Sequence, residues 1–294
     1  MDKVELVSYA KVNLTLEVSG KRADGYHEID SIVQTIDITD DLIMTKAEPG
    51  VISVTCDTAG VPEGSGNIIY AACKEFFTRS GLHAGVECLL RKRIPMQAGL
   101  GGGSGNAAAA VAGLNRLYEC GLEAKELAEI AAAAGSDAPL FIYGGTIRMR
   151  GRGEIIDPLP DAPQMHIVVV KPGVGVSTAW AYAELDKSNI SRCESASQRA
   201  ERAIRESDRD GLIAGMCNDF DPVVTAEFDE VRLAKSRLIE TGAQRAMLSG
   251  SGSAVFGVFD TYDAARQAAM DLMGEFAQVF LTRTVGRDKS SLIW

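Results

Sequence analysis

The sequence predicts a mixed α+β fold, and three features of its 294 residues point to it. In the first third, apolar Val12, Leu14, Leu16 and Val18 alternate with polar residues, which is typical of a half-buried strand. A glycine-rich loop then leads into an alanine-rich segment that favours a helix. The second half alternates strand-like and helix-like segments, as α+β proteins do.

The elements of the first half can be placed in order. Polar Asp-Asp and Pro-Gly turns separate the early strands, and Gly81 marks the end of the first helix. We expect strands at 4–8, 12–18, 31–38, 42–45, 51–56 and 85–94, and later at 146–150 and 154–158. Helices are expected at 67–80, 106–119 and 123–134.

A proline-rich break at 158–163 is the best candidate for a domain boundary. We therefore expect one domain over residues 1–160 and a second over residues 161–294. In the second domain the patterns predict strands at 165–171, 243–249, 254–259 and 279–284. They predict helices at 178–185, 194–207, 222–240 and 261–274.

Composition excludes several classes of function. The net charge of −10 opposes binding to nucleic acid, and no apolar run approaches the roughly 18 residues that span a bilayer. Met1 leads directly into a strand-like segment without a signal peptide, so we expect a cytoplasmic protein with no membrane partner. The six cysteines form no C-x-x-C pair, and we expect reduced thiols, although spacing alone leaves disulfides open. The oligomeric state cannot be predicted.

The segment from Pro95 to Asn106 is the most informative in the chain. It holds five glycines within seven residues and runs into a helix, so its backbone N–H groups can turn toward one anion. A flexible surface turn is the simpler alternative, but such turns rarely join an apolar strand to an apolar helix. A Walker A motif is excluded because no lysine lies between Lys92 and Lys125. A dinucleotide-binding fingerprint is excluded because Ser104 occupies the position of its third glycine. Protein-kinase signatures are also missing. We predict a phosphate-binding loop of another class.

Four other clusters could carry chemistry, and each has a structural alternative. Lys11 shares the polar face of a strand with Asn13, where an exposed lysine is common. The turn containing Tyr26 and His27 could be a surface loop. Asp137 precedes a proline and could simply cap a short helix. The late loop 249–253 could be a tight hairpin, or could bring its backbone close to a second phosphate.

Taken in order, these segments resemble the GHMP superfamily of small-molecule kinases, from Ala10 to Phe259. The shared features are a lysine on the first strand, a P-x-x-x-G-L-G-G-G-S loop, a G-S-D-x-P turn and a late S-G-S-G-S loop. Within the superfamily, the R-x-D-G-Y-H element at 22–27 resembles the kinases that phosphorylate the 2-hydroxyl of a cytidine-diphosphate-linked methylerythritol. The implied fold is an N-terminal domain like ribosomal protein S5 and a ferredoxin-like C-terminal domain, with the active site between them.

The resemblance also implies roles for residues. Lys11 and Asp137 match the catalytic pair, with Asp137 as base and Lys11 orienting the hydroxyl. Asn13, Tyr26, His27 and Tyr182 match substrate-binding positions. ATP and Mg²⁺ are the implied cofactors, with Ser104 as a candidate Mg²⁺ ligand. The implied phosphate cradle consists of Pro95, Met96, Gln97, Ala98, Gly99, Leu100, Gly101, Gly102, Gly103, Ser104 and Gly105.

Two other functions remain as alternatives at this stage. Another kinase of the superfamily, of the homoserine or mevalonate type, would share the lysine, the aspartate and the glycine loop, but the element at 22–27 argues against it. A non-catalytic ligand sensor of the same fold should have lost one of these three features, and all three are present.

Overall fold

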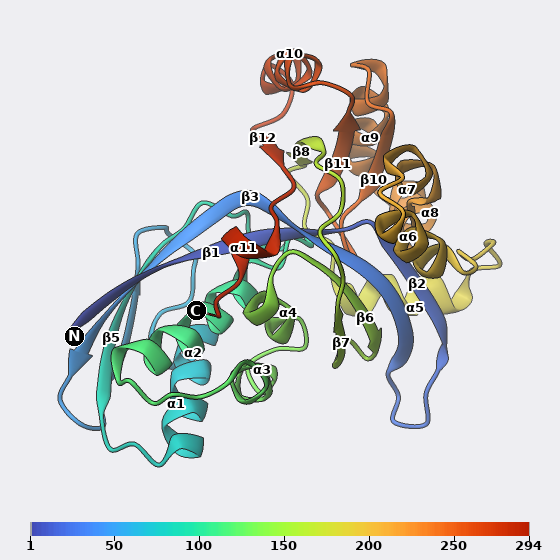
Figure 1. Ribbon diagram of the computed structural model, residues 1–294. Coiled ribbons are helices and arrows are strands. Elements are labelled where there is room, and N and C mark those ends of the chain that lie inside the picture. The colour runs from blue at the N-terminus through green and yellow to red at the C-terminus, as the bar shows by residue number, and fades with distance from the viewer. Residues whose placement is uncertain (1, 294) are drawn as a thin grey trace.

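The computed structural model describes residues 2–293 and arranges them around two β-sheets (Figure 1). The larger sheet is built on one long strand, β3, which pairs with β1, β2, β5 and β6. Its strands are β1 (Lys3–Asn13), β2 (Thr15–Lys21), β3 (His27–Ala47), β4 (Ile52–Cys56), β5 (Gly85–Arg91), β6 (Thr146–Gly151), β7 (Ile155–Pro158) and β9 (Cys217–Asn218). The smaller sheet has the order β10-β11-β8-β12. Its strands are β8 (His166–Lys171), β10 (Arg245–Leu248), β11 (Val255–Phe259) and β12 (Gln278–Arg283).

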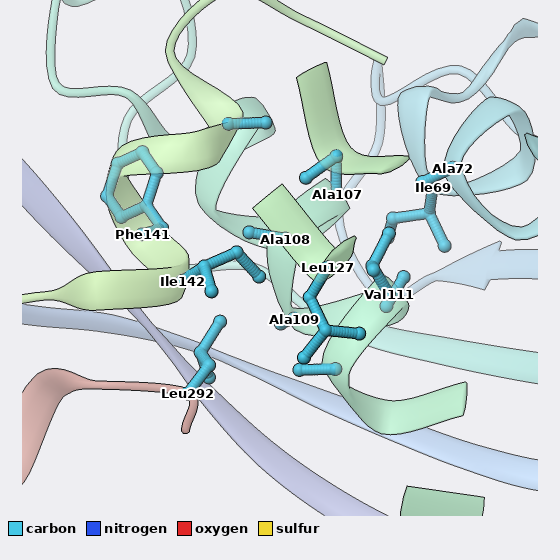
Figure 2. Close-up of a cluster of buried hydrophobic side chains, with 14 of the residues drawn as sticks. Ile69, Ala72, Ala107, Ala108, Ala109, Val111, Leu127, Phe141, Ile142 and Leu292 are labelled. Atoms are coloured by element: carbon cyan, nitrogen blue, oxygen red, sulfur yellow. The ribbon is translucent and has the colours of Figure 1, made fainter. Parts of the chain in front are cut away.

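The helices of the first half lie together on one face of the larger sheet (Figure 1). They are α1 (Ile68–Ser80), α2 (Gly102–Leu117), α3 (Ala124–Ala132) and α4 (Ala138–Tyr143), preceded by a 3-10 turn at Gly64–Gly66. The alanine-rich helix α2 is buried in the middle of this layer, where its small side chains contact Ile69, Leu127 and Ile142 (Figure 2). Alanine favours the helix and lets its neighbours pack closely.

The remaining helices belong mainly to the second half. They are α5 (Thr178–Lys187), α6 (Ala196–Arg205), α7 (Arg209–Gly215), α8 (Phe220–Glu227), α9 (Asp229–Glu240), α10 (Tyr262–Met273) and α11 (Arg287–Ser290). The two halves share a hydrophobic core, in which Val12 and Ile36 of the larger sheet meet Ile167 and Phe256 of the smaller one. This shared core fixes the relative position of the two sheets, which is what a site between them requires.

The prediction of a mixed α+β fold is confirmed, but the elements differ in detail from those expected, as three examples show. The predicted turn at Asp40–Asp41 lies inside β3, where the buried Asp40 carboxylate is fully hydrogen-bonded. Helix α2 begins at Gly102, four residues earlier than predicted, since its glycines adopt helical geometry. The predicted helix 222–240 is two helices that meet at Phe228.

The cysteine prediction was also wrong for one pair. Cys193 and Cys217 form a disulfide, with their Cα atoms 6.1 Å apart, and the four other cysteines are free. The pair is 24 residues apart in sequence and meets only because β9 lies beside the segment that precedes α6.

The predicted domain boundary at 160/161 falls between β7 and β8, where the chain passes from one sheet to the other. Residues 290–292 return to the first half, and Leu292 packs in the core around α2 (Figure 2). The division therefore stays a prediction. Among residues 2–293, no helix is both long and apolar enough to span a bilayer.

Candidate active site

The glycine loop and the start of α2 enclose a cavity of about 400 Å³. All the predicted cradle residues from Pro95 to Ser104 line it, together with apolar side chains such as Val61 and Ile68. Gly101 is the N-cap of α2 with φ 71°, and no side chain caps the helix there. The first N–H groups of α2 therefore lack helical partners next to this cavity, an arrangement that favours an anion.

Gly105 is the exception among the predicted cradle residues, since it does not line the cavity. A Cβ atom at this position would lie 2.6 Å from Ser8 Oγ and 3.1 Å from the Tyr9 carbonyl oxygen. Glycine is needed here because α2 approaches β1 so closely. The role of Gly105 in the structure is thus to let the helix pack against the strand.

A buried carboxylate that the sequence analysis missed fixes the base of the loop. Asp40 of β3 accepts hydrogen bonds from the backbone of Arg93 (2.7 Å) and Ile94 (2.8 Å), from Asn106 Nδ2 (3.0 Å) and from Lys92 Nζ (2.7 Å). The Asp40 side chain is fully buried. This ties the loop on both sides of its glycines to the longest strand. The only signal in the sequence was a pair of aspartates within an apolar stretch.

A second cavity, of about 170 Å³, adjoins the first, and Gly99 and Gly101 line both. Lys11 of β1 and Asp137 face it, with Lys11 Nζ 4.0 Å from Asp137 Oδ2. The structural alternative, an exposed strand lysine, does not hold: the Lys11 side chain is only 5% exposed, whereas the Asp137 side chain is 41% exposed. Burial lowers the pKa of Lys11, and the nearby Asp137 carboxylate opposes that shift.

Asp137 stands at the N-cap position of α4, yet its side chain makes no capping hydrogen bond. The Asp137 side chain therefore does not cap the helix, which was the structural alternative in the sequence analysis. Because it is half exposed and lines the cavity beside Lys11, the carboxylate is available to a ligand.

Lys11 is held by a chain of buried hydrogen bonds. Its Nζ donates to Asn13 Oδ1 at 2.7 Å, and Asn13 Nδ2 donates to Ser31 Oγ at 2.9 Å. Ser31 in turn donates its single hydroxyl proton to the Thr15 carbonyl oxygen. Ser31 must therefore accept from the Asn13 amide nitrogen, and this leaves the amide oxygen for the lysine. Lys11 and Asn13 are brought together as predicted, whereas Ser31 gave no signal in the sequence.

The aromatic residues of the predicted substrate site are only partly brought together. Tyr182 of α5 lines the second cavity, and the His27 ring stacks on it at 4.6 Å between centroids. Burial, with a contribution from Asp137, raises the pKa of Tyr182 to about 12. Tyr26 lines neither cavity: it is 57% exposed, and the Arg152 guanidinium lies 5.1 Å from its ring centre.

The late glycine loop closes the second cavity from the other half of the chain. Gly250 and Ser251 line it, and Ser251 Oγ lies 2.8 Å from Thr178 Oγ1 at the start of α5. Ser249 Oγ donates to the Gly99 carbonyl oxygen at 3.0 Å. The two glycine loops are therefore in direct contact, and each half of the chain supplies walls of the site.

Comparison with known proteins identifies the family to which the chain belongs. Residues 67–145 match the family described as GHMP kinases N terminal domain, and residues 200–276 match GHMP kinases C terminal. The chain is 42% identical to 4-diphosphocytidyl-2-C-methyl-D-erythritol kinase of Moorella thermoacetica over 97% of this chain and 100% of that one. It is 39% identical to the protein of the same name from Acetivibrio thermocellus, over 97% and 100%.

Solved structures show the same relationship. A crystal structure of 4-(cytidine 5'-diphospho)-2C-methyl-D-erythritol kinase matches with a TM-score of 0.81 at 30% identity, over 96% of this chain and 100% of that one. Homoserine kinase from Cytophaga hutchinsonii matches with a TM-score of 0.79 at 18% identity, over 99% and 96%, a likeness of fold alone. The predicted superfamily is thus confirmed, and the chain belongs to the 4-diphosphocytidyl-2-C-methyl-D-erythritol kinase family of GHMP kinases.

Proposed function

We propose that this protein transfers the γ-phosphoryl group of ATP to the 2-hydroxyl of 4-diphosphocytidyl-2-C-methyl-D-erythritol, in the non-mevalonate route to isoprenoid precursors. The observation that carries the proposal is the junction of the two cavities at Gly99 and Gly101. Phosphates held by the glycine loop would lie beside Lys11 and Asp137. The names of the relatives supply the identity of the acceptor.

The chemistry needs a base, because an alcohol is a poor nucleophile until it loses its proton to a nearby group. The oxygen of the 2-hydroxyl attacks the γ-phosphorus, and Asp137 accepts the proton that this hydroxyl loses. The bond from that phosphorus to the bridging oxygen breaks, and ADP leaves with the bonding electron pair. Lys11 orients the hydroxyl with its ammonium group and balances the charge on the transferred phosphoryl.

The nucleotide is proposed to occupy the larger cavity. Its apolar wall of Val61, Ile68 and Leu90 suits a purine ring, and the start of α2 suits the phosphates. Among residues 2–293 no group of three or more acidic, histidine or cysteine side chains could hold a metal. Ser104 Oγ, which lines this cavity, would be the protein ligand of an Mg²⁺ ion whose other ligands would come from ATP and water. Such an ion would neutralise phosphate charge during transfer.

Asn13, Tyr26, His27 and Tyr182 are proposed to bind the cytidine substrate. His27 lies against Tyr182 at the edge of the second cavity, which supports a place for the base there. Tyr26 would have to turn inward from its exposed position to stack on a base.

We also propose that the chain divides into an N-terminal domain over residues 1–160 and a C-terminal domain over residues 161–294.

The test is ADP release from ATP and Mg²⁺ with 4-diphosphocytidyl-2-C-methyl-D-erythritol, beside homoserine and mevalonate. Turnover with the cytidine substrate alone is expected. Turnover only with homoserine or mevalonate would agree with the proposed roles of Lys11 and Asp137 but would reject the proposed substrate. ATP binding without turnover of any acceptor would favour a ligand sensor.

A further inference from the structure

Two residues on one face of α5 hold the side chain of His27. Tyr182 stacks on the imidazole with an angle of 18° between the rings, and Asp186 Oδ1 lies 2.7 Å from His27 Nε2. The two residues are four positions apart, so they lie one above the other on the helix. The His27 side chain is only 9% exposed, although it belongs to a strand that starts after a polar turn. Stacking on Tyr182 therefore fixes the plane of the His27 ring, and the contact with Asp186 fixes its rotation within that plane.

The contact with Asp186 decides which ring nitrogen carries the proton. A carboxylate has only acceptor atoms, so Nε2 must donate. In the neutral ring, Nδ1 then carries the lone pair. Among residues 2–293, no hydrogen bond is made by Nδ1, which leaves one acceptor of defined orientation beside Tyr182.

Cytosine and uracil differ in what they offer such an acceptor. Cytosine has an exocyclic amine that donates, whereas uracil has a carbonyl oxygen at the same position. An acceptor facing the uracil oxygen would leave both groups unpaired, and that is a costly arrangement. A histidine fixed with its proton on Nε2 therefore favours cytosine.

We infer that Asp186 is a positioning residue for base selection: it keeps the His27 proton on Nε2, so that Nδ1 accepts from the cytosine amine and rejects uracil. This inference rests on the proposed function, because it takes the cytidine group to bind at His27. Asp186 itself does not touch the reacting atoms. Its effect is confined to affinity for the base and leaves phosphoryl transfer alone.

Glu184 provides a matched control on the same helix. Its side chain is 40% exposed, against 41% for Asp186, and it pairs with Lys187 at 3.1 Å. Changes at Glu184 alter the charge of α5 by the same amount without touching His27. Asp186→Ala removes the acceptor, and Asp186→Lys replaces it with a group that can only donate.

The first measurement is kcat/KM for the cytidine substrate and for its uridine counterpart. We expect wild-type protein to prefer the cytidine compound by about 10- to 100-fold. Asp186→Ala should raise KM for the cytidine substrate and lower the preference severalfold, and Asp186→Lys should abolish it. KM for ATP should not change, and Glu184→Ala and Glu184→Lys should behave as wild type. An unchanged preference in both Asp186 variants would overturn the inference, and so would an equal loss for both bases.

The second measurement does not depend on turnover. Nitrogen-15 spectra of protein labelled at its three histidines report which ring nitrogen is protonated. At a pH of about 8, where imidazole is ordinarily neutral, His27 should carry its proton on Nε2 in wild type and on Nδ1 in Asp186→Lys. A wild-type Nδ1–H form, or equal binding of CDP and UDP, would refute the inference whatever the enzyme phosphorylates. Preferential CDP binding without turnover would refute the proposed function alone.

Discussion

Gly99→Ala is the most direct test of how the two halves of the site are joined. Gly99 has φ 72°, and a Cβ atom there would lie 2.0 Å from the carbonyl oxygen of Ser249 and 3.2 Å from the amide nitrogen of Gly252. Both obstacles are backbone atoms, so no side chain can rotate aside. Since non-bonded atoms need about 3.5 Å, the two glycine loops would have to separate by more than about 1 Å.

The loss of stability in Gly99→Ala is the sum of two free-energy terms. A non-glycine residue in the left-handed region costs about 1–2 kcal/mol, and forcing atoms into a packed contact costs about 1–3 kcal/mol. Gly99→Ala should therefore lower the free energy of unfolding by about 2–5 kcal/mol. The same separation would break the hydrogen bond from Ser249 Oγ to the Gly99 oxygen and open the cavity wall. We expect kcat/KM for ATP to fall at least about tenfold, since positioning errors of 1 Å are costly in catalysis.

The assays are thermal unfolding and steady-state kinetics in ATP, with Gly103→Ala as the matched control for stability alone. Gly103 lies in the first turn of α2, and an added Cβ would meet nothing closer than Ile68, at 3.8 Å. In a helix, alanine is more stable than glycine by about 0.5–1 kcal/mol, so this variant should unfold no earlier than wild type. A Gly99→Ala protein with wild-type stability and wild-type ATP kinetics would refute the reasoning. So would an equal loss of stability in the control.

Three further predictions concern the proposed chemistry. Asp137→Asn should lower kcat by about 10²- to 10⁴-fold while the affinity for ATP, measured by calorimetry, stays nearly unchanged; near-wild-type turnover would refute its role as base. His27→Ala should raise KM for the cytidine substrate by about 10- to 100-fold, and an effect confined to ATP would count against base recognition. Burial lowers the pKa of Lys11, so its ammonium is lost at a lower pH than is usual for lysine. A pH profile of kcat/KM, which reports the groups of the free enzyme, should therefore fall on its alkaline side below the ordinary lysine range, and a plateau through that range would contradict a role for the charged form.

Local patterns in the sequence were enough to predict the fold class and the glycine loop that leads into a helix. Alternating apolar residues predicted the early strands, and the run of glycines before alanines predicted a loop entering a helix. The error at Asp40 has a physical cause. Adjacent aspartates favour turns unless a buried carboxylate is fully paired. Here its partners come from Lys92 to Asn106, more than 50 residues away, and a local pattern cannot reveal them.

The site shows the same limit. Lys11 and Asn13 are two positions apart on one strand. Since such side chains lie on the same face of a strand, their proximity could be predicted. Asp186 lies 159 residues from His27, and no local pattern indicates that α5 faces the polar turn. Only the family resemblance, which matched Tyr182 and His27 to substrate-binding positions, pointed to this proximity. The disulfide between Cys193 and Cys217 depends in the same way on tertiary packing. Contacts between segments far apart in the sequence depend on tertiary packing, and local patterns miss them.

The burial of Lys11 shows how contacts within the first half of the chain matter for function. An ammonium removed from water destabilises a protein unless other groups compensate it. Asp137 is 4.0 Å away and half exposed, so it compensates only in part. The remaining compensation comes from Asn13, whose amide oxygen faces Lys11 because Ser31 can accept only from the amide nitrogen. With one proton engaged in this way, Lys11 keeps others for a ligand in the cavity. A lysine serving stability alone would be better placed at the surface, so its position favours a role in charge balance during transfer.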